Sequence, residues 1–319
     1  MNGHYTLVLR WFLKIWRLVG MDPFALTGGD NERVELNAFW KTYAIMTTIF
    51  FSVTSVYIIL RSYLSAGLLS TKSLFLYVAA SGWASSLSFC VAVLLHGRAF
   101  ANAINFVFRN VSVAGKRRVE SYCIFGVTLL LLCVTYRFFK IFFADYRFSE
   151  KPLYYVGYAI LLLAMWDICR VFIAFLGGIQ FTTCVLLLTL KIERGLTEFN
   201  ALRSVHRCGQ LRNAYRECFE VAEILNQVFR IPLIISTIRT IVAITSAVYI
   251  LLFDTRIVFW AVFLSLTILL ESLNLYLLVY ACDTSHKAVS SELPCQCPKL
   301  VSLVVSLLST AKLCSRYLT

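Results

Sequence analysis

The chain has 319 residues, of which 59% are hydrophobic and only 15% are charged. Soluble domains carry ~45–50% apolar and ~25% charged residues, so this composition excludes an ordinary soluble globular domain. A net charge of +13 would suggest a nucleic-acid partner for a soluble protein, but here the basic residues lie between long apolar segments. We therefore expect an integral membrane protein that has the lipid bilayer, and no nucleic acid, as its partner.

Near the N-terminus, the bases Arg10, Lys14 and Arg17 recur every three or four residues. A secretory signal peptide needs a continuously apolar core, which these bases interrupt. The spacing predicts an amphipathic helix, which either lies on the membrane surface or packs as a solvated helix on the rest of the protein.

Several apolar segments follow, near the ~20 residues that a helix needs to cross the hydrocarbon core. They predict spans at about 43–60, 74–95, 122–143, 154–175 (extending to 190), 231–253 and 258–281. The fourth is long enough for two spans, with Gly177-Gly178 as a possible break. The weaker apolar stretch at 300–308 leaves a seventh span missing or vestigial. We expect an all-α fold, a multi-pass transmembrane helical bundle with six clear spans, forming a single transmembrane domain over residues 1–319.

The basic residues indicate the orientation. If the fourth segment crosses once, the N-terminal segment, the second and fourth loops and the C-terminal tail hold 21 Lys and Arg, against five on the other side. Basic loops stay in the cytoplasm, so we predict a cytoplasmic N-terminus and a fourth span that continues into the cytoplasm. Residues 191–230 carry apolar positions at helical spacing, which predicts cytoplasmic helices there.

Four charged residues fall inside predicted spans. A helical hairpin that turns at Asp254-Thr255-Arg256 places Arg239 and Glu271 at the same depth, ~20 Å from the turn. An unpaired charge there costs ~2.5–3.5 kcal/mol, so we expect these two to pair. Asp167 and Arg170, three residues apart, share a helix face at a similar depth. This intramembrane charge layer is either a structural ion pair or a gate or polar ligand contact.

Aromatic residues are frequent in the outer halves of the spans. Tyr and Trp usually form belts at the membrane interface. The alternative is an aromatic pocket for a small organic molecule. The candidates for ligand binding are Tyr77, Trp83, Tyr136, Phe139, Tyr155, Tyr158 and Tyr249.

The sequence offers no chemistry for catalysis. Cys295 and Cys297 form one C-x-C pair without a second pair or a His at ligand spacing. Glycine-rich phosphate loops, G-x-S-x-G and H-E-x-x-H are absent from the sequence. We expect no enzyme activity, no metal site and no cofactor.

Two segments and the topology carry a resemblance. The opening LRWFLKIWRLVGMDPF, the stretch YRECFEVAEILNQVFRIPLI (215–234) and the long fourth span resemble the arthropod gustatory receptor family, within the insect chemoreceptor superfamily. The resemblance implies a taste receptor of the plasma membrane: a ligand-gated cation channel subunit that detects small organic tastants. It also implies a homo- or hetero-oligomer, with four subunits around the pore.

The chain departs from that family at its end. Family members close with a seventh span, carrying Thr-Tyr, five apolar residues and Gln-Phe, which lines the pore; residues 309–319 have no such match. The resemblance therefore implies that this chain alone conducts little or no current.

Two alternatives stay open. A G-protein-coupled receptor could pair Cys123 with Cys208 in an extracellular disulfide, but that orientation puts the 21 bases outside. A small-molecule transporter or membrane enzyme is the other, although the sequence shows no internal repeat or pair of broken helices.

Overall fold

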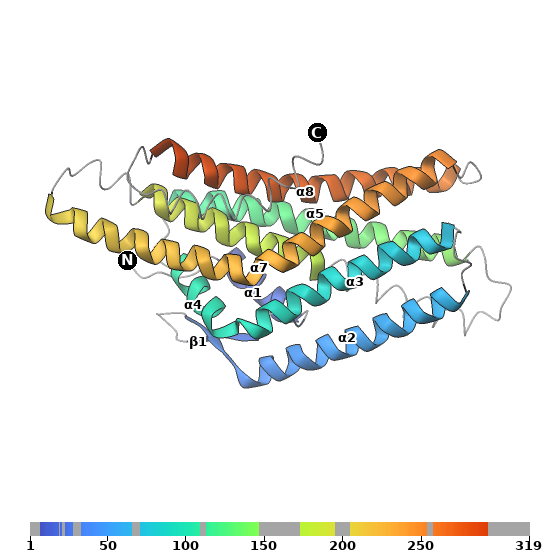
Figure 1. Ribbon diagram of the computed structural model, residues 1–319, viewed down its shortest axis with the longest axis horizontal. Helices are drawn as coiled ribbons and strands as arrows, with labels where there is room; N and C mark the ends of the chain where they lie inside the picture. The colour runs from blue at the N-terminus through green and yellow to red at the C-terminus, as the bar shows by residue number, and fades with distance from the viewer. Residues whose placement is uncertain are drawn as a thin grey trace.

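The computed structural model describes residues 7–18, 20, 23–27, 33–65, 71–108, 113–146, 173–194, 205–253 and 258–292. Long helices run side by side along the longest axis of the molecule (Figure 1). They are α2 (Ala38–Ser65), α3 (Thr71–Leu95), α5 (Val113–Tyr146), the helix Ile173–Arg194, α7 (Val205–Phe253) and α8 (Val258–Glu292). Of the two short helices, α1 (Leu7–Leu18) packs on α5 and α4 (Gly97–Phe108) packs on α7.

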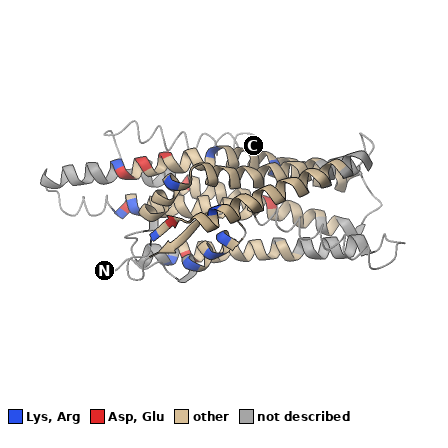
Figure 2. Ribbon diagram, turned by 90° about the horizontal axis from the view of Figure 1, so that it is seen from below, with Lys and Arg blue, Asp and Glu red and all other residues tan. Residues whose placement is uncertain are grey.

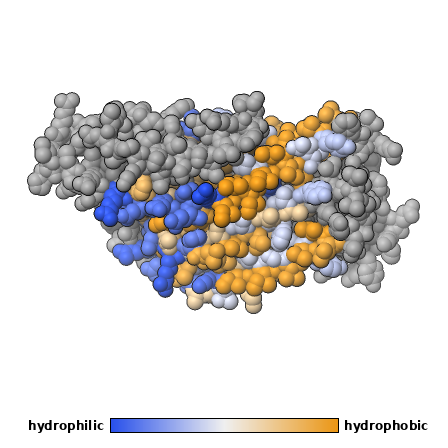
Figure 3. All heavy atoms as spheres, viewed as in Figure 1, coloured by the Kyte–Doolittle hydropathy of each residue, from blue (hydrophilic) through white to orange (hydrophobic). Residues whose placement is uncertain are grey.

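Four helices among the described residues are long and apolar enough to cross a membrane. They are Tyr77–Leu95, Ile173–Arg194, Arg216–Leu252 and Leu264–Thr284, and Val119–Leu132 is a shorter apolar helix. Charged residues gather near the end that carries the N-terminus (Figure 2), and away from that end the described residues of the visible face are largely hydrophobic (Figure 3). This distribution is that of a multi-pass membrane protein.

The helix Ile173–Arg194 passes through Gly177 and Gly178 without a break, so these glycines do not divide the predicted fourth segment. Their role is packing. A Cβ on Gly177 would lie 2.5 Å from Cδ1 of Phe89, so the ring of this α3 residue sits directly on the glycine. The first part of the predicted fourth span, residues 154–172, lies outside the described residues.

The all-α prediction missed a small sheet. Strands β1 (Phe24–Thr27) and β2 (Arg33–Leu36) pair antiparallel, with Phe24 opposite Leu36 and Thr27 opposite Arg33. The side chain of Asn105 in α4 extends the ladder, since its Nδ2 donates to the Val34 carbonyl and its Oδ1 accepts from the Val34 N–H, both at 2.8 Å. A polar side chain thus satisfies backbone groups that the edge of a two-stranded sheet would leave unpaired.

Helix α1 is amphipathic, as its spacing predicts, and it packs on the bundle. Leu13 and Trp16 are buried, while Trp11 and Leu18 are exposed. The chain leaves α1 at Gly20, which has φ of 78° and donates its N–H to the Arg17 carbonyl at 2.9 Å. This left-handed glycine is the usual way for a helix to end, and it lets the backbone lie against Thr47 of α2.

Phe229 lies at the centre of an aromatic cluster in the described part of the core. Phe229 of α7 contacts Phe100 and Phe181 with ring centroids 5.4 Å apart, and Phe89 at 6.3 Å. These partners come from α4, the helix Ile173–Arg194 and α3, so four helices meet there. Helix α7 continues unbroken through this core from the predicted cytoplasmic stretch into the predicted fifth span. It bends near its middle, where Pro232 lacks the N–H of a regular helical hydrogen bond (Figure 1).

Candidate functional site

A buried ion pair joins α7 to α8. Arg239 Nη1 donates to Glu271 Oε1 at 2.8 Å, and Arg239 Nη2 donates to Glu271 Oε2. Both residues are buried, at 4% and 3% exposure. The hairpin spacing predicts this pairing, because two helices leaving one turn keep equal depths at equal distances from it.

The next residue, Thr240, extends the ion pair into a small network. Its hydroxyl donates to Glu271 Oε2 at 3.3 Å and lies 3.5 Å from Arg239 Nη2. Two parallel bonds between a guanidinium and a carboxylate are strong because both partners are charged and their planar geometries match. Arg239 Nε is buried with no hydrogen-bond partner among the described residues, so the network keeps one donor unsatisfied.

Close packing of α7 on α8 continues toward the turn. Ala247 and Ile250 of α7 are buried against Leu264 of α8. Small residues at helix contacts let backbones approach, which favours association in lipid. The ion pair and this apolar seam therefore hold the two helices together at successive depths.

A small cavity with several polar side chains in its lining lies beside the ion pair. Four helices line it: α5 with Tyr122, the helix Ile173–Arg194 with Thr182, α7 with Thr237 and Thr240, and α8 with Asn274. Its other lining residues are Gly178, Ile179, Leu233, Ser236, Leu275, Leu277 and Leu278. The free space holds little more than a water molecule, for which ~10–15 Å³ of accessible volume is enough. A tastant-sized molecule does not fit in this conformation.

Most hydroxyl groups around the cavity already donate a hydrogen bond within the protein. Thr182 donates to the Gly178 carbonyl at 2.6 Å, Thr237 to the Leu233 carbonyl at 2.9 Å and Tyr122 to the Leu277 carbonyl at 3.4 Å. Their oxygen lone pairs remain as acceptors. The cavity therefore suits a hydrogen-bond donor such as water or a ligand hydroxyl.

The aromatic candidates have different positions in the structure. Tyr77 on α3 and Tyr249 on α7 are 59% and 49% exposed, so they lie on the bundle surface. Trp83 is half-buried, and its indole nitrogen has no hydrogen-bond partner within the described part of the chain. The side chains of Tyr136 and Phe139 lie outside the described residues, as do Tyr155 and Tyr158 entirely. A shared aromatic pocket stays a prediction.

Asp167 and Arg170 also lie outside the described residues, so their place in the charge layer stays a prediction. Sequence reasoning missed the hydroxyl groups around Arg239. A signal was present, because Leu233, Thr237 and Thr240 recur at helical spacing, and Asn274 follows Glu271 by three residues. These intervals put the polar residues of each helix on one face.

Together, the apolar helices, the buried ion pair and the charged end define a multi-pass helical membrane protein. No protein-family model and no curated protein sequence matches the chain. Among solved structures, it is similar to the insect olfactory receptor OR5 from Machilis hrabei, with a TM-score of 0.64 and 13% identity over 95% of this chain and 88% of that chain. The same receptor in complex with eugenol matches with a TM-score of 0.64 and 14% identity, over 96% of this chain and 89% of that one. At this identity the likeness shows a shared fold.

Proposed function

We propose that the chain is a chemosensory receptor of the insect chemoreceptor superfamily, acting as a ligand-gated cation channel subunit in the plasma membrane. The observation that carries the proposal is the likeness to an insect olfactory receptor over 95% of the chain. Its proposed topology has six spans and a cytoplasmic N-terminus, supported by the charge asymmetry of the loops. Its proposed assembly is a homo- or hetero-oligomer, with four subunits by resemblance.

The proposed stimulus is a small organic tastant. The gustatory assignment rests on the N-terminal motif and on residues 215–234, which resemble the gustatory receptor family. The proposed ligand contacts are the aromatic candidates, of which Trp83 has the most favourable position because its buried indole N–H is available to a ligand acceptor.

The Arg239–Glu271 pair is proposed to couple ligand binding to gating. Thr240 belongs both to the ion-pair network and to the cavity lining, so a change in cavity hydration alters the surroundings of the pair directly. Pro232, two turns before Arg239, gives α7 a place to bend. Movement of α7 against α8 at this depth would exchange one set of polar contacts for another.

The G-protein-coupled alternative loses one of its supports. Cys123 is a free, buried thiol whose Sγ lies 3.5 Å from Thr183 Oγ1. The disulfide with Cys208 that this alternative calls for is therefore not formed.

Electrophysiology tests the proposed function. The chain is expressed in cultured cells, alone and beside a related receptor subunit, and surface delivery is verified with an epitope tag. Beside the related subunit, a tastant panel should evoke a cation current that persists when G-protein signalling is inhibited, whereas the chain alone should carry little or no current. Responses that need G proteins and carry no direct current would overturn the channel assignment. Glu271→Gln should shift the dose–response curve of any current, whereas Arg216→Gln, on an exposed part of α7, should leave it unchanged.

A further inference from the structure

Ser85 of α3 carries a buried hydroxyl that has no hydrogen-bond partner among the described residues. The residue is fully buried, at 0% exposure. Neighbouring hydroxyls differ, since Ser86 donates to the Gly82 carbonyl at 3.0 Å and Ser88 donates to the Ser85 carbonyl at 2.7 Å. A buried hydroxyl without a bond is unfavourable, so an acceptor within its reach would stabilise it.

Pro232 of α7 creates an acceptor of this kind. Proline has no N–H, so the carbonyl of Val228, four residues earlier, lacks the donor that a regular helix supplies. Both Val228 and Pro232 are buried. The proline ring also clashes with this carbonyl, which opens the helix on that face at the place where α7 bends (Figure 1). A buried donor on α3 and a buried acceptor on α7 thus both lack their usual partners.

The packing of α3 on α7 brings these two groups to nearly the same depth. The helices run side by side in opposite directions (Figure 1), and the ring centroids of Phe89 and Phe229 lie 6.3 Å apart between them. Ser85 precedes Phe89 by four residues, which is ~6 Å toward the end where α7 turns into α8. Pro232 follows Phe229 by three residues, which is ~4.5 Å in the same direction. Intervals of three and four residues also keep each of them on the face of its phenylalanine.

The two parts of α7 on either side of Pro232 are held differently. Before the proline, Leu225 and Phe229 belong to the main core, where Phe229 contacts rings from three other helices. After it, Ala247 and Ile250 belong to a separate small cluster with Leu264 of α8. The first part is therefore anchored, and the second part can change its angle at Pro232 together with α8.

We propose that Ser85 and the Val228 carbonyl form a switchable hydrogen bond between α3 and α7. The bond is absent in the conformation of Figure 1 and forms in a second conformation, in which the outer part of α7 has a different angle at Pro232. The new bond satisfies two buried groups at once, which offsets the packing that the movement disturbs. The proposal goes beyond the proposed receptor function, because it holds whether or not the chain conducts ions.

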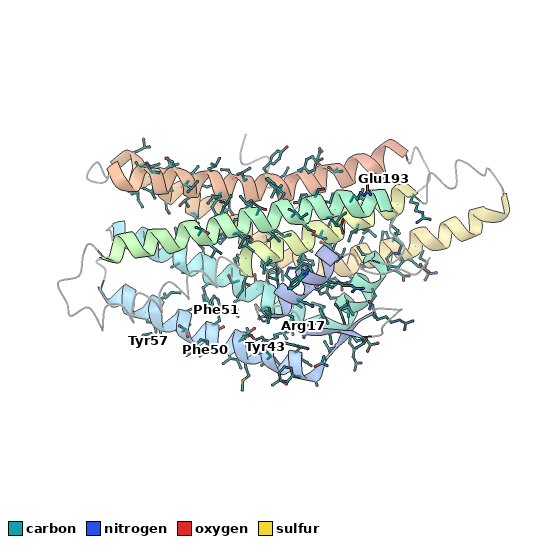
Figure 4. The ribbon with its side chains drawn as sticks, turned by 180° about the vertical axis from the view of Figure 1, so that it is seen from behind. Arg17, Tyr43, Phe50, Phe51, Tyr57 and Glu193 are labelled. Atoms are coloured by element: carbon teal, nitrogen blue, oxygen red, sulfur yellow. The ribbon has the colours of Figure 1, made fainter. Side chains whose placement is uncertain are left out.

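The angle of α7 can be measured as a distance in the purified full chain. One spin label replaces Leu252 near the end of α7, and the other replaces Tyr57 of α2, which Figure 4 shows beyond Phe50 along that helix; both positions are exposed, at 67% and 62%. Attachment through ketone-bearing amino acids leaves the native cysteines unlabelled. Leu252 lies ~30 Å along the helix from Pro232, so a change of ~10° in the bend moves its label by ~5 Å. Double electron–electron resonance resolves such a shift, and we expect two distances.

Variants at Ser85 connect the second distance to the hydrogen bond. Ser85→Ala should lower the population of the second distance about fivefold, which corresponds to one hydrogen bond. Ser85→Cys should lower it less, because a thiol is a weak donor. Ser86→Ala is the matched control, since it removes an equally buried hydroxyl that already bonds within α3, and it should leave both populations unchanged. Pro232→Ala gives the Val228 carbonyl its helical donor, so it should leave one distance, and adding Ser85→Ala should then have no effect.

Four results would overturn the proposal: a single distance in the unmodified chain, equal effects of Ser85→Ala and Ser86→Ala, two distances in Pro232→Ala, or an ordered water that bridges Ser85 and Val228 in both conformations. If Ser85→Ala fails to fold, Ser85→Cys and Pro232→Ala still decide the question. The measurement needs no ionic current, so its failure is distinguishable from failure of the proposed receptor function.

Discussion

Removing one partner of the Arg239–Glu271 pair should destabilise the protein far more than removing both. Both side chains are buried and joined by two hydrogen bonds, so Glu271→Gln or Arg239→Gln leaves a lone charge inside the bundle. Breaking a buried pair in this way costs ~3–5 kcal/mol, whereas replacing both partners by apolar residues of similar size is often neutral. The double variant Arg239→Met/Glu271→Met should therefore recover most of the loss, and the charge swap Arg239→Glu/Glu271→Arg part of it.

The measurement is the folded yield and the thermal midpoint of the purified protein, by fluorescence-detected size exclusion. Helix α7 supplies a matched control, since Arg216 and Glu220 form an exposed pair at 3.1 Å, and such i,i+4 pairs contribute only ~0.3–0.5 kcal/mol. Arg216→Gln should thus have almost no effect. The reasoning is refuted if the double variants are no better than the worse single variant, or if Arg216→Gln is as damaging as Arg239→Gln.

Three further predictions follow from other parts of the chain. Asn110, in the only N-x-S/T sequon, should stay unglycosylated because its loop is predicted to be cytoplasmic; a glycosidase-sensitive mass shift that vanishes in Asn110→Gln would reverse the orientation. Gly177→Ala should lower stability by ~1–3 kcal/mol through overpacking on Phe89, and adding Phe89→Leu should relieve it; additive losses in a thermal-shift assay would contradict the contact. Asn105→Leu should cost ~1–3 kcal/mol and increase protease cleavage near Val34, because it removes two hydrogen bonds that hold β2; an unchanged digestion pattern would argue against that role.

The ion pair could be predicted from the sequence because a tight hairpin turn converts residue number into depth. Arg239 and Glu271 lie at equal distances from the turn, and the high cost of an unpaired charge left pairing as the favourable outcome. The same reasoning could not predict the small sheet. Each strand has only four residues, and the backbone of β2 is completed by Asn105, which lies 71 residues away along the chain.

The position of α1 and the lining of the cavity could not be predicted from the sequence. Helical spacing predicts that α1 is amphipathic, but its burial against the bundle depends on Trp16 meeting residues from distant segments. The cavity depends on Tyr122, Thr182 and Asn274 converging from three helices, and no spacing rule relates these residues to one another. Local periodicity gives the face of each helix, and only tertiary packing decides which faces meet.

The buried ion pair also constrains how the chain is made. Arg239 precedes Glu271 by 32 residues, so a ribosome adding ~5–20 residues per second leaves the arginine without its partner for about 2–6 s. Entering lipid alone during that interval would cost α7 ~2.5–3.5 kcal/mol. Retention of α7 by the insertion machinery until α8 has been synthesised would avoid this cost, and the two helices would then leave it together as a hairpin.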